Sequence, residues 1–335
     1  MTVRLTVDDL GVAFQGAAGP LKVVHDVSFT LEDGQTLAVV GESGSGKSVT
    51  SLAVMRLLPP PPRAVLSGRA VLHGEADVDL IALPERRVRR LRGDRIAMIF
   101  QEPLTSLNPV HRVGAQIVES IRCHRDVTTQ AARRRALDLL EQVGIPEPEQ
   151  RLESYPHELS GGMRQRVMIA IALALEPEVL IADEPTTALD VTVQAQILEL
   201  LRELQERTGM AMLFITHNFG VVAEIADRTM VMYSGRVVEE GGVAEVLERP
   251  LMPYTSGLMR SVPRLESAGL GDADLATIEG FVPDPARMPP GCAFHPRCAH
   301  HKPGLCDVGA PALESATADH RLRCKRWREV EGGAR

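Results

Sequence analysis

The stretch GESGSGKS, residues 41–48, decides the fold of this chain. It satisfies the pattern G-x-x-x-x-G-K-[ST], which is specific when a strand precedes it and a helix follows it. The apolar run LAVV at 37–40 has the character of a buried strand, and the residues after the loop predict a helix over 48–58 that the prolines at 59–62 end. Glycines allow the backbone amides to turn inward, and the helix start adds partial positive charge. The stretch therefore predicts a phosphate-binding loop.

This loop predicts contacts with ATP and magnesium. Lys47 is expected to reach the outer phosphates, and the Ser48 hydroxyl is suited to Mg²⁺. An exposed glycine-rich turn is the alternative interpretation, and the strand and helix on either side of the loop disfavour it. The residues expected to surround the nucleotide are Gly41, Glu42, Ser43, Gly44, Ser45, Gly46, Lys47, Ser48 and Val49.

A second apolar run, VLIAD, ends in two adjacent carboxylates, Asp183 and Glu184. Doubly wound sheets bind ligands at the carboxyl ends of their strands. Because the chain turns at a strand end, Asp183 can face magnesium while Glu184 faces the water beyond the outer phosphate. Glu184 is therefore the candidate general base. Without the phosphate loop, such a pair would be an ordinary solvated strand end.

The pattern along the chain predicts an α/β architecture. Alternating apolar residues at 3–14 and 24–31 indicate antiparallel strands. Apolar runs ending at Asp183 and Thr216 are separated by a helix that Gly209 closes, which predicts a right-handed parallel unit. Helices dominate from about 110 to 175, and proline and glycine become frequent after Arg249, which marks a boundary near 250.

Composition limits the partners of the chain. Its 335 residues favour one large domain with an appendage. A net charge of −7 argues against a nucleic-acid or lipid-binding surface, and the arginine-rich stretch at 85–95 lacks interleaved aromatic residues. The longest apolar run, 167–175, is far shorter than the roughly 20 residues of a spanning helix, and the start of the chain lacks a secretory signal. We therefore expect a cytoplasmic chain that reaches a membrane only through protein contacts.

The cysteines are unevenly placed. Cys123 stands alone and is expected to be structural. The other four lie in the tail, separated by five, seven and seventeen residues: Cys292, Cys298, Cys306 and Cys324. Four thiolates suit zinc or an iron–sulfur cluster, and these spacings match neither a zinc ribbon nor a ferredoxin. Three histidines of the tail are expected to be ordinary surface residues: His295, His300 and His301.

Five further sites together resemble the ATP-binding subunits of ABC transporters. The segment LSGGMRQR at 159–166 resembles the ABC signature. Gln101, after the strand at 95–100, resembles the Q-loop, and ALD ending at Asp190 resembles the D-loop. His217 matches the switch histidine, and Phe14 lies where the family stacks an aromatic ring on adenine. Each alone would be unremarkable, but their order around the phosphate loop and the acidic strand is specific.

This resemblance implies an ABC-type P-loop ATPase fold. The ATPase domain is expected over 1–249, with a mixed sheet core, an antiparallel β subdomain and a helical subdomain at about 103–175. A small cysteine-containing extension is expected over 250–335. Two such domains would dimerise, with each ATP between the phosphate loop of one and the signature of the other. The resemblance assigns catalytic roles to Glu184, His217, Lys47 and Gln101, magnesium contacts to Ser48, Gln101 and Asp183, and nucleotide contacts also to Phe14, Ser160, Gly161, Gly162 and Asp190.

The tail narrows the resemblance to importers of oligopeptides and dipeptides. It carries RPLMPYTSGLMRSVPRL at 249–265 and PPGCAFHPRCAHHKPGLC at 289–306. The resemblance implies a 4Fe–4S cluster at the four tail cysteines, with zinc or no metal as alternatives. The implied partners are two transmembrane permeases, a paralogous second ATPase forming a heterodimer, and an extracytoplasmic substrate-binding protein. The implied location is the cytoplasmic face of a bacterial membrane, as a peripheral subunit without nucleic acid.

Other interpretations remain open. Relatives that import nickel, opines or glycosides share similar ATPase subunits. A soluble ABC ATPase working on DNA or ribosomes typically has two cassettes or a long coiled coil, and this chain has one cassette with only about 110 residues between loop and signature. A redox-regulated switch, with the cysteine tail as its active element, is the third possibility.

Overall fold

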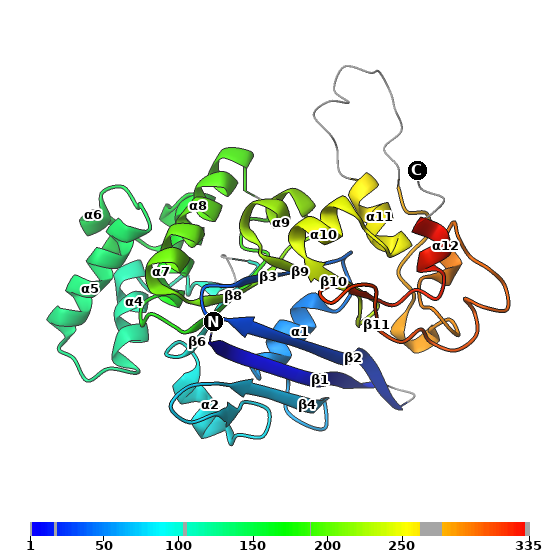
Figure 1. Cartoon of the computed structure of the whole chain (residues 1–335). Helices are drawn as coiled ribbons and strands as arrows, with labels where there is room; N and C mark the ends of the chain where they lie inside the picture. The colour runs from blue at the N-terminus through cyan, green and yellow to red at the C-terminus, as the bar shows by residue number, and fades with distance from the viewer. Residues whose placement is uncertain (1, 17–18, 103–105, 188, 262–276, 332–335) are drawn as a thin grey trace, which may run out of the picture. The chain divides into compact units, whose positions relative to one another are not determined.

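The computed structural model describes residues 2–16, 19–102, 106–187, 189–261 and 277–331 (Figure 1). Three expectations fall partly outside this range: the helical subdomain at 103–105, the D-loop at Ala188 and the tail motif at 262–265. The chain divides into two compact units. We call them the acidic-strand unit, formed by Met1–Thr6, Thr30–Gln35 and Val71–Phe214, and the phosphate-loop unit, formed by Val7–Phe29, Thr36–Ala70 and Ile215–Arg335.

A four-stranded sheet has the order β2-β1-β4-β5. Its long strands are built from the alternating segments near the N-terminus, and β4 pairs antiparallel with β5. The prediction that these two segments form strands is therefore confirmed. The strand bounds are β1 Val3–Gly16, β2 Gly19–Glu32, β4 Ala64–Leu72 and β5 Val78–Asp79.

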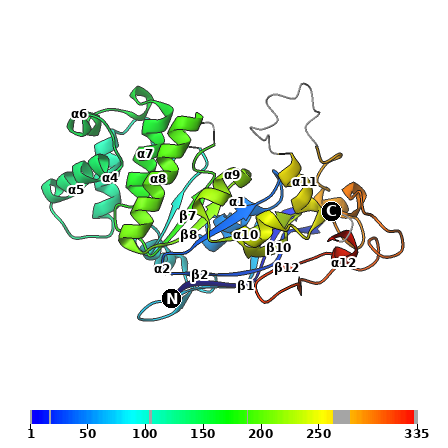
Figure 2. The ribbon, with the colours of Figure 1, turned by 45° about the horizontal axis from the view of Figure 1, so that its top comes forward.

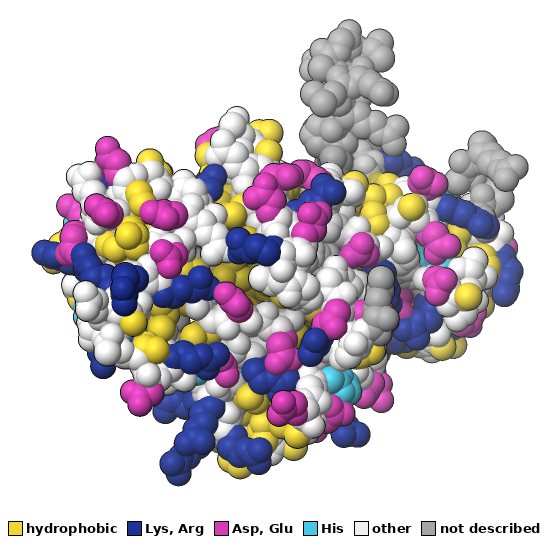
Figure 3. Space-filling model, turned by 60° about the vertical axis from the view of Figure 1, so that its left-hand side comes forward, with side chains coloured by type: hydrophobic (Ala, Val, Ile, Leu, Met, Phe, Trp, Pro, Cys, Tyr) yellow, Lys and Arg dark blue, Asp and Glu magenta, His cyan; other side chains and the backbone are white. Residues whose placement is uncertain are grey.

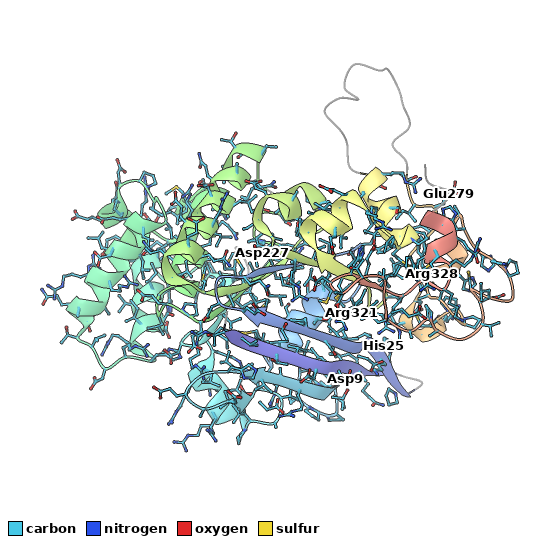
Figure 4. All side chains as sticks on the ribbon, in the orientation of Figure 1. Asp9, His25, Asp227, Glu279, Arg321 and Arg328 are labelled. Carbon is cyan, nitrogen blue, oxygen red and sulfur yellow. The ribbon has the colours of Figure 1, made fainter. Side chains whose placement is uncertain are left out.

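Sheet strands of the phosphate-loop unit have the order β11-β12-β10-β9-β3. Strand β3 runs parallel to β9, with Val39 opposite Met230, and the strand before the phosphate loop is fully buried as predicted. Asp227 joins the starts of these two strands because its carboxylate accepts a hydrogen bond of 2.8 Å from the Thr36 amide (Figure 4). The bounds are β3 Thr36–Val40, β9 Arg228–Tyr233, β10 Arg236–Gly242, β11 Glu314–Ser315 and β12 Arg321–Leu322.

The C-terminal extension continues this sheet. Strand β12 pairs antiparallel with β10, so that Leu322 lies opposite Glu239 (Figure 2). Aromatic rings of Tyr233, Tyr254 and Phe294 form a buried cluster with centroids 4.6 to 5.3 Å apart, which gives the extension a shared core with β9. Short helices complete the region: α10 Val243–Glu248, α11 Pro253–Arg260, η3 Pro285–Arg287, η4 His295–Arg297 and α12 Trp327–Glu331.

The helix after the phosphate loop, α1 Lys47–Val54, is shorter than the predicted 48–58. Met55 closes it, and Arg56 has a φ of 55°, which is outside the helical region. The chain has therefore left the helix before the proline run at 59–62, so the prolines are not what ends it. The next helix of this unit is α9 Phe219–Ile225.

The acidic-strand unit contains β6 Ile96–Ile99 and β7 Val179–Asp183 in parallel register, with β8 Ala211–Ile215 next to β7. Gly209, at a φ of 68°, closes the helix before β8, as the sequence predicted. Helices α4 to α7 lie together beside these strands (Figures 1 and 2). The helix bounds are α2 Glu85–Leu91, α4 Val113–Arg122, α5 Thr129–Gln142, α6 Pro148–Leu152, η1 Pro156–Glu158, α7 Gly161–Ala172 and α8 Val191–Thr208.

Surface charges are mixed rather than uniformly basic on the face that Figure 3 shows, where acidic and basic side chains alternate. Within the arginine-rich stretch, Arg92 pairs with Glu85 at 2.6 Å and Arg95 pairs with Glu178 at 2.6 Å. Cys123, expected to be structural, is an exposed free thiol. None of the helices in the described part of the chain has the length and apolar character needed to cross a bilayer.

Candidate functional site

The phosphate loop needs glycine at defined positions. Gly41, Gly44 and Gly46 have φ values of 151°, 79° and 100°, which disfavour side chains. A Cβ atom on Gly41 would lie 2.3 Å from the carbonyl oxygen of Met232. The backbone of the loop is thus held against the end of β9, and the predicted strand–loop–helix arrangement is present.

Lys47 folds back over the loop that precedes it. Its ammonium donates hydrogen bonds to the carbonyl oxygens of Gly41, at 2.7 Å, and Glu42, at 3.1 Å. Only 5% of this residue is exposed. The Ser45 side chain is also buried within the loop. This arrangement places a positive charge at the start of α1, where the exposed ends of helical amides also favour an anion.

Glu42 has contacts that the sequence did not indicate. It was expected to surround the phosphates, but its carboxylate accepts hydrogen bonds of 2.6 and 2.9 Å from Arg297. This carboxylate raises the pKa of the Arg297 guanidinium. The amide of Glu42 donates to the Tyr254 hydroxyl at 2.9 Å, and burial raises the pKa of Tyr254. Neither partner carried a signal in the sequence, because both lie more than 200 positions away.

Two other predicted nucleotide contacts belong to the phosphate-loop unit. His217 follows β8 and is exposed. The next residue, Asn218, caps α9 by accepting a hydrogen bond of 2.8 Å from the Gly220 amide, which fixes the turn that carries His217. Phe14 lies on β1 and is partly buried.

The end of β7 carries the predicted acidic pair. Asp183 is 4% exposed, whereas Glu184 has a φ of 46° and turns away from the strand direction. The Glu184 carboxylate accepts hydrogen bonds from the Gln101 amide at 3.1 Å and the Thr187 hydroxyl at 2.8 Å. The structure therefore brings together Gln101 and Glu184, which were predicted separately. Two donors orient this carboxylate, as a base that receives a proton from water requires.

The signature forms the start of α7. Ser160 caps this helix by accepting a hydrogen bond of 3.3 Å from the Met163 amide, and Gly161 and Gly162 form its first turn. A Cβ atom on Gly162 would lie 2.8 Å from the Val193 side chain on α8, so a larger residue here would force a shift. Asp190 caps α8 with a hydrogen bond of 2.9 Å from the Val193 amide. The signature and D-loop residues thus sit at two neighbouring helix starts.

All four tail cysteines line one cavity of about 20 Å³. Burial raises the pKa of Cys292, Cys298 and Cys324, the last to about 11. His295 lines the same cavity, and both of its ring nitrogens are buried without a hydrogen-bond partner, so it is not an ordinary surface residue. Among the described residues, no group of three or more His, Cys, Asp or Glu side chains is arranged to hold a metal ion. Four thiols are chemically suited to a soft metal ion, but their side chains are not arranged to hold one in this structure.

Family models match two parts of the chain. Residues 24–187 match the family described as ABC transporter. Residues 238–306 match the family described as oligopeptide/dipeptide transporter, C-terminal region. The first match spans the phosphate loop, the signature and the acidic strand, and the second spans three of the four tail cysteines.

Curated relatives match over nearly the whole length. A putative peptide import ATP-binding protein of Brucella abortus is 51% identical over 97% of this chain and 98% of its own. The oligopeptide transport ATP-binding protein OppD of Bacillus subtilis is 51% identical over 90% of this chain and 82% of its own. The dipeptide transport ATP-binding protein DppD of the same organism is 47% identical over 96% and 93%.

Solved structures of ATP-binding cassettes share the fold. A bacterial ABC transporter cassette, solved as a dimer, has a TM-score of 0.63 and 26% identity, covering 71% of this chain and 98% of its own. CbiO1 from Clostridium perfringens, part of an ABC transporter complex, has a TM-score of 0.60 and 28% identity, covering 74% and 92%.

Proposed function

Because this chain belongs to the ABC transporter family and is an ABC-type ATPase, we propose that it powers the import of di- and oligopeptides. The cargo assignment rests on the similarity of nearly the whole chain, including the C-terminal region, to proteins named for peptide import. Nickel, opine or glycoside import is the alternative for the same ATPase.

The roles of the site residues follow from their chemistry. We propose that Lys47 and the loop amides bind the outer phosphates, while Ser48, Asp183 and Gln101 would hold a Mg²⁺ ion, which would supply positive charge against the charge that develops on the phosphates. Glu184 takes the proton from the attacking water. The hydrogen bonds from Gln101 and Thr187 support this role because they orient the carboxylate.

Further nucleotide contacts are proposed for the remaining predicted residues. His217 would contact the outer phosphate, Phe14 would stack on adenine, and the signature residues and Asp190 would complete the site of a partner ATPase. Ser160 supports the last assignment because it caps a helix start, a position that favours an anion.

We propose that two transmembrane permeases, a paralogous second ATPase and an extracytoplasmic binding protein are the partners. The chain would lie at the cytoplasmic face of a bacterial membrane and would bind no nucleic acid. Purification of tagged protein from detergent-solubilised membranes tests this assembly. Two permeases and a second ATPase should copurify; recovery with ribosomes or DNA, or recovery of this chain without a membrane protein, would contradict it.

A 4Fe–4S cluster at the four tail cysteines is a separate proposal, with zinc as the alternative. The shared cavity and the two unpartnered nitrogens of His295 support a ligand there. The thiols would have to separate, because the cavity has room for about one water molecule. Anaerobically purified protein should be brown and contain iron and sulfide; a colourless protein with stoichiometric zinc, or with no metal, would refute the cluster.

A further inference from the structure

We propose that Arg297 of the C-terminal extension is a positioning residue for the phosphate loop: by holding Glu42, it fixes the loop conformation that binds ATP. The proposal rests on ATP binding by residues 41–48 and is independent of the transported cargo. It makes the extension a functional part of the nucleotide site.

The guanidinium of Arg297 is fully engaged. Its side chain is only 5% exposed, and two of its nitrogens donate to the two carboxylate oxygens of Glu42 at 2.6 and 2.9 Å. Its other donors reach the carbonyl oxygens of Ile278, at 3.2 Å, and Glu279, at 3.0 Å, and the Tyr233 hydroxyl, at 3.4 Å. This paired geometry matches the planar fork of arginine, which lysine cannot reproduce.

The aromatic cluster holds both partners in place. The guanidinium carbon of Arg297 lies 5.9 Å from the ring centre of Tyr233 and 6.0 Å from that of Phe294. Tyr254, which is fully buried in the same cluster, accepts a hydrogen bond of 2.9 Å from the Glu42 amide. Both the side chain and the main chain of Glu42 are therefore anchored by residues outside the phosphate-loop motif.

Glu42 is in direct contact with Lys47, so its position affects the position of the lysine. The carbonyl oxygen of Glu42 accepts a hydrogen bond of 3.1 Å from the Lys47 ammonium, which also donates to the adjacent Gly41 carbonyl at 2.7 Å. A displacement of Glu42 would move an acceptor of Lys47 and change the position of the ammonium that binds phosphate. Arg297 also directly precedes Cys298, so adjacent residues reach the phosphate loop and the cysteine-lined cavity.

The test measures ATP hydrolysis against ATP concentration in the assembly of this chain with its permeases and second ATPase, together with thermal unfolding of the full-length chain. In Arg297→Gln the KM for ATP should rise about tenfold, the scale of a lost hydrogen bond to a charged group, while kcat changes less than about twofold. Arg297→Lys should recover only part of the affinity. Adding Glu42→Gln to Arg297→Gln should lower the KM again, because the unpaired carboxylate is removed.

Arg321→Gln is the matched control. Arg321 also lies in the extension and pairs with Glu240 of β10 rather than with a residue of the phosphate loop. Arg321→Gln should lower the melting temperature without changing the KM for ATP. An unchanged KM in folded Arg297→Gln, or equal KM changes in the two variants, would overturn the proposal. If Arg297→Gln does not fold, Glu42→Gln alone should raise the KM severalfold, and an unchanged KM would overturn the proposal in the same way. If the assembly with the wild-type chain had no ATPase activity, that result would instead refute the enzymatic assignment.

Discussion

Replacing Glu239 by alanine should destabilise the phosphate-loop unit strongly. Glu239 lies on β10 and is completely buried. Its carboxylate accepts hydrogen bonds of 2.6 Å from the Leu251 amide and 3.2 Å from the Met252 amide, and it contacts the His320 ring at 2.8 Å. One side chain thus joins β10 to the entry of α11 and to the C-terminal extension.

The three donors set the size of the effect. Each buried donor that loses its acceptor costs about 1–3 kcal/mol, so three give about 3–9 kcal/mol before relaxation. Partial relaxation around the alanine should bring the loss to about 4 kcal/mol of unfolding free energy. His320→Ala removes one donor and leaves both backbone amides bonded to Glu239, and should therefore cost about 1–2 kcal/mol.

Urea unfolding followed by circular dichroism measures both losses. Glu248→Ala is the control, because Glu248 is exposed near the end of α10, and its loss should stay within about 0.5 kcal/mol. If Glu239→Ala unfolded at the same urea concentration as Glu248→Ala, the extension would not be anchored through this carboxylate and the reasoning would be wrong.

Three further predictions test the site and its surroundings. Glu184→Gln should lower ATP turnover by about 10²- to 10⁴-fold while nucleotide binding is retained, and near-normal turnover would remove Glu184 as the base. Gly162→Ala should cost about 1–3 kcal/mol because its Cβ would meet Val193 at 2.8 Å, and Val193→Ala should restore the melting temperature; an unchanged single variant would contradict the packing. Burial raises the pKa of Tyr254 above its usual 10.0, so the unfolded chain releases this proton first and stability should fall as pH rises above 10. Tyr254→Phe should show a shallower fall, and equal slopes in urea unfolding would contradict the assignment.

Local sequence determined most of the nucleotide-binding elements. The loop at 41–48 could be predicted because its glycines, lysine and flanking strand act over a few neighbouring residues. Gly209 ended its helix as expected because its left-handed conformation is a local property. The end of α1 was predicted too late. The sequence indicated the prolines at 59–62 as the helix breaker, but the backbone leaves the helical conformation at Arg56.

Local sequence patterns could not predict the long-range contacts. Arg297 and Glu42 are separated by 255 positions, and no periodicity or motif relates them. The same holds for the buried contact between His320 and Glu239. Nothing in the local sequence distinguished His295 from a surface histidine, and only the folded extension places its ring against the cysteine-lined cavity. The contacts of these residues are determined by tertiary packing and not by the local sequence.

Uptake of labelled peptides into proteoliposomes tests the central claim most directly. The vesicles would contain the permeases, the second ATPase and this chain, with the binding protein outside and ATP inside. Di- and oligopeptides should accumulate with the wild-type chain, and accumulation should stop with Glu184→Gln. Accumulation of nickel, opines or glycosides without peptides, or peptide uptake that is unchanged by Glu184→Gln, would contradict a peptide importer driven by this ATPase.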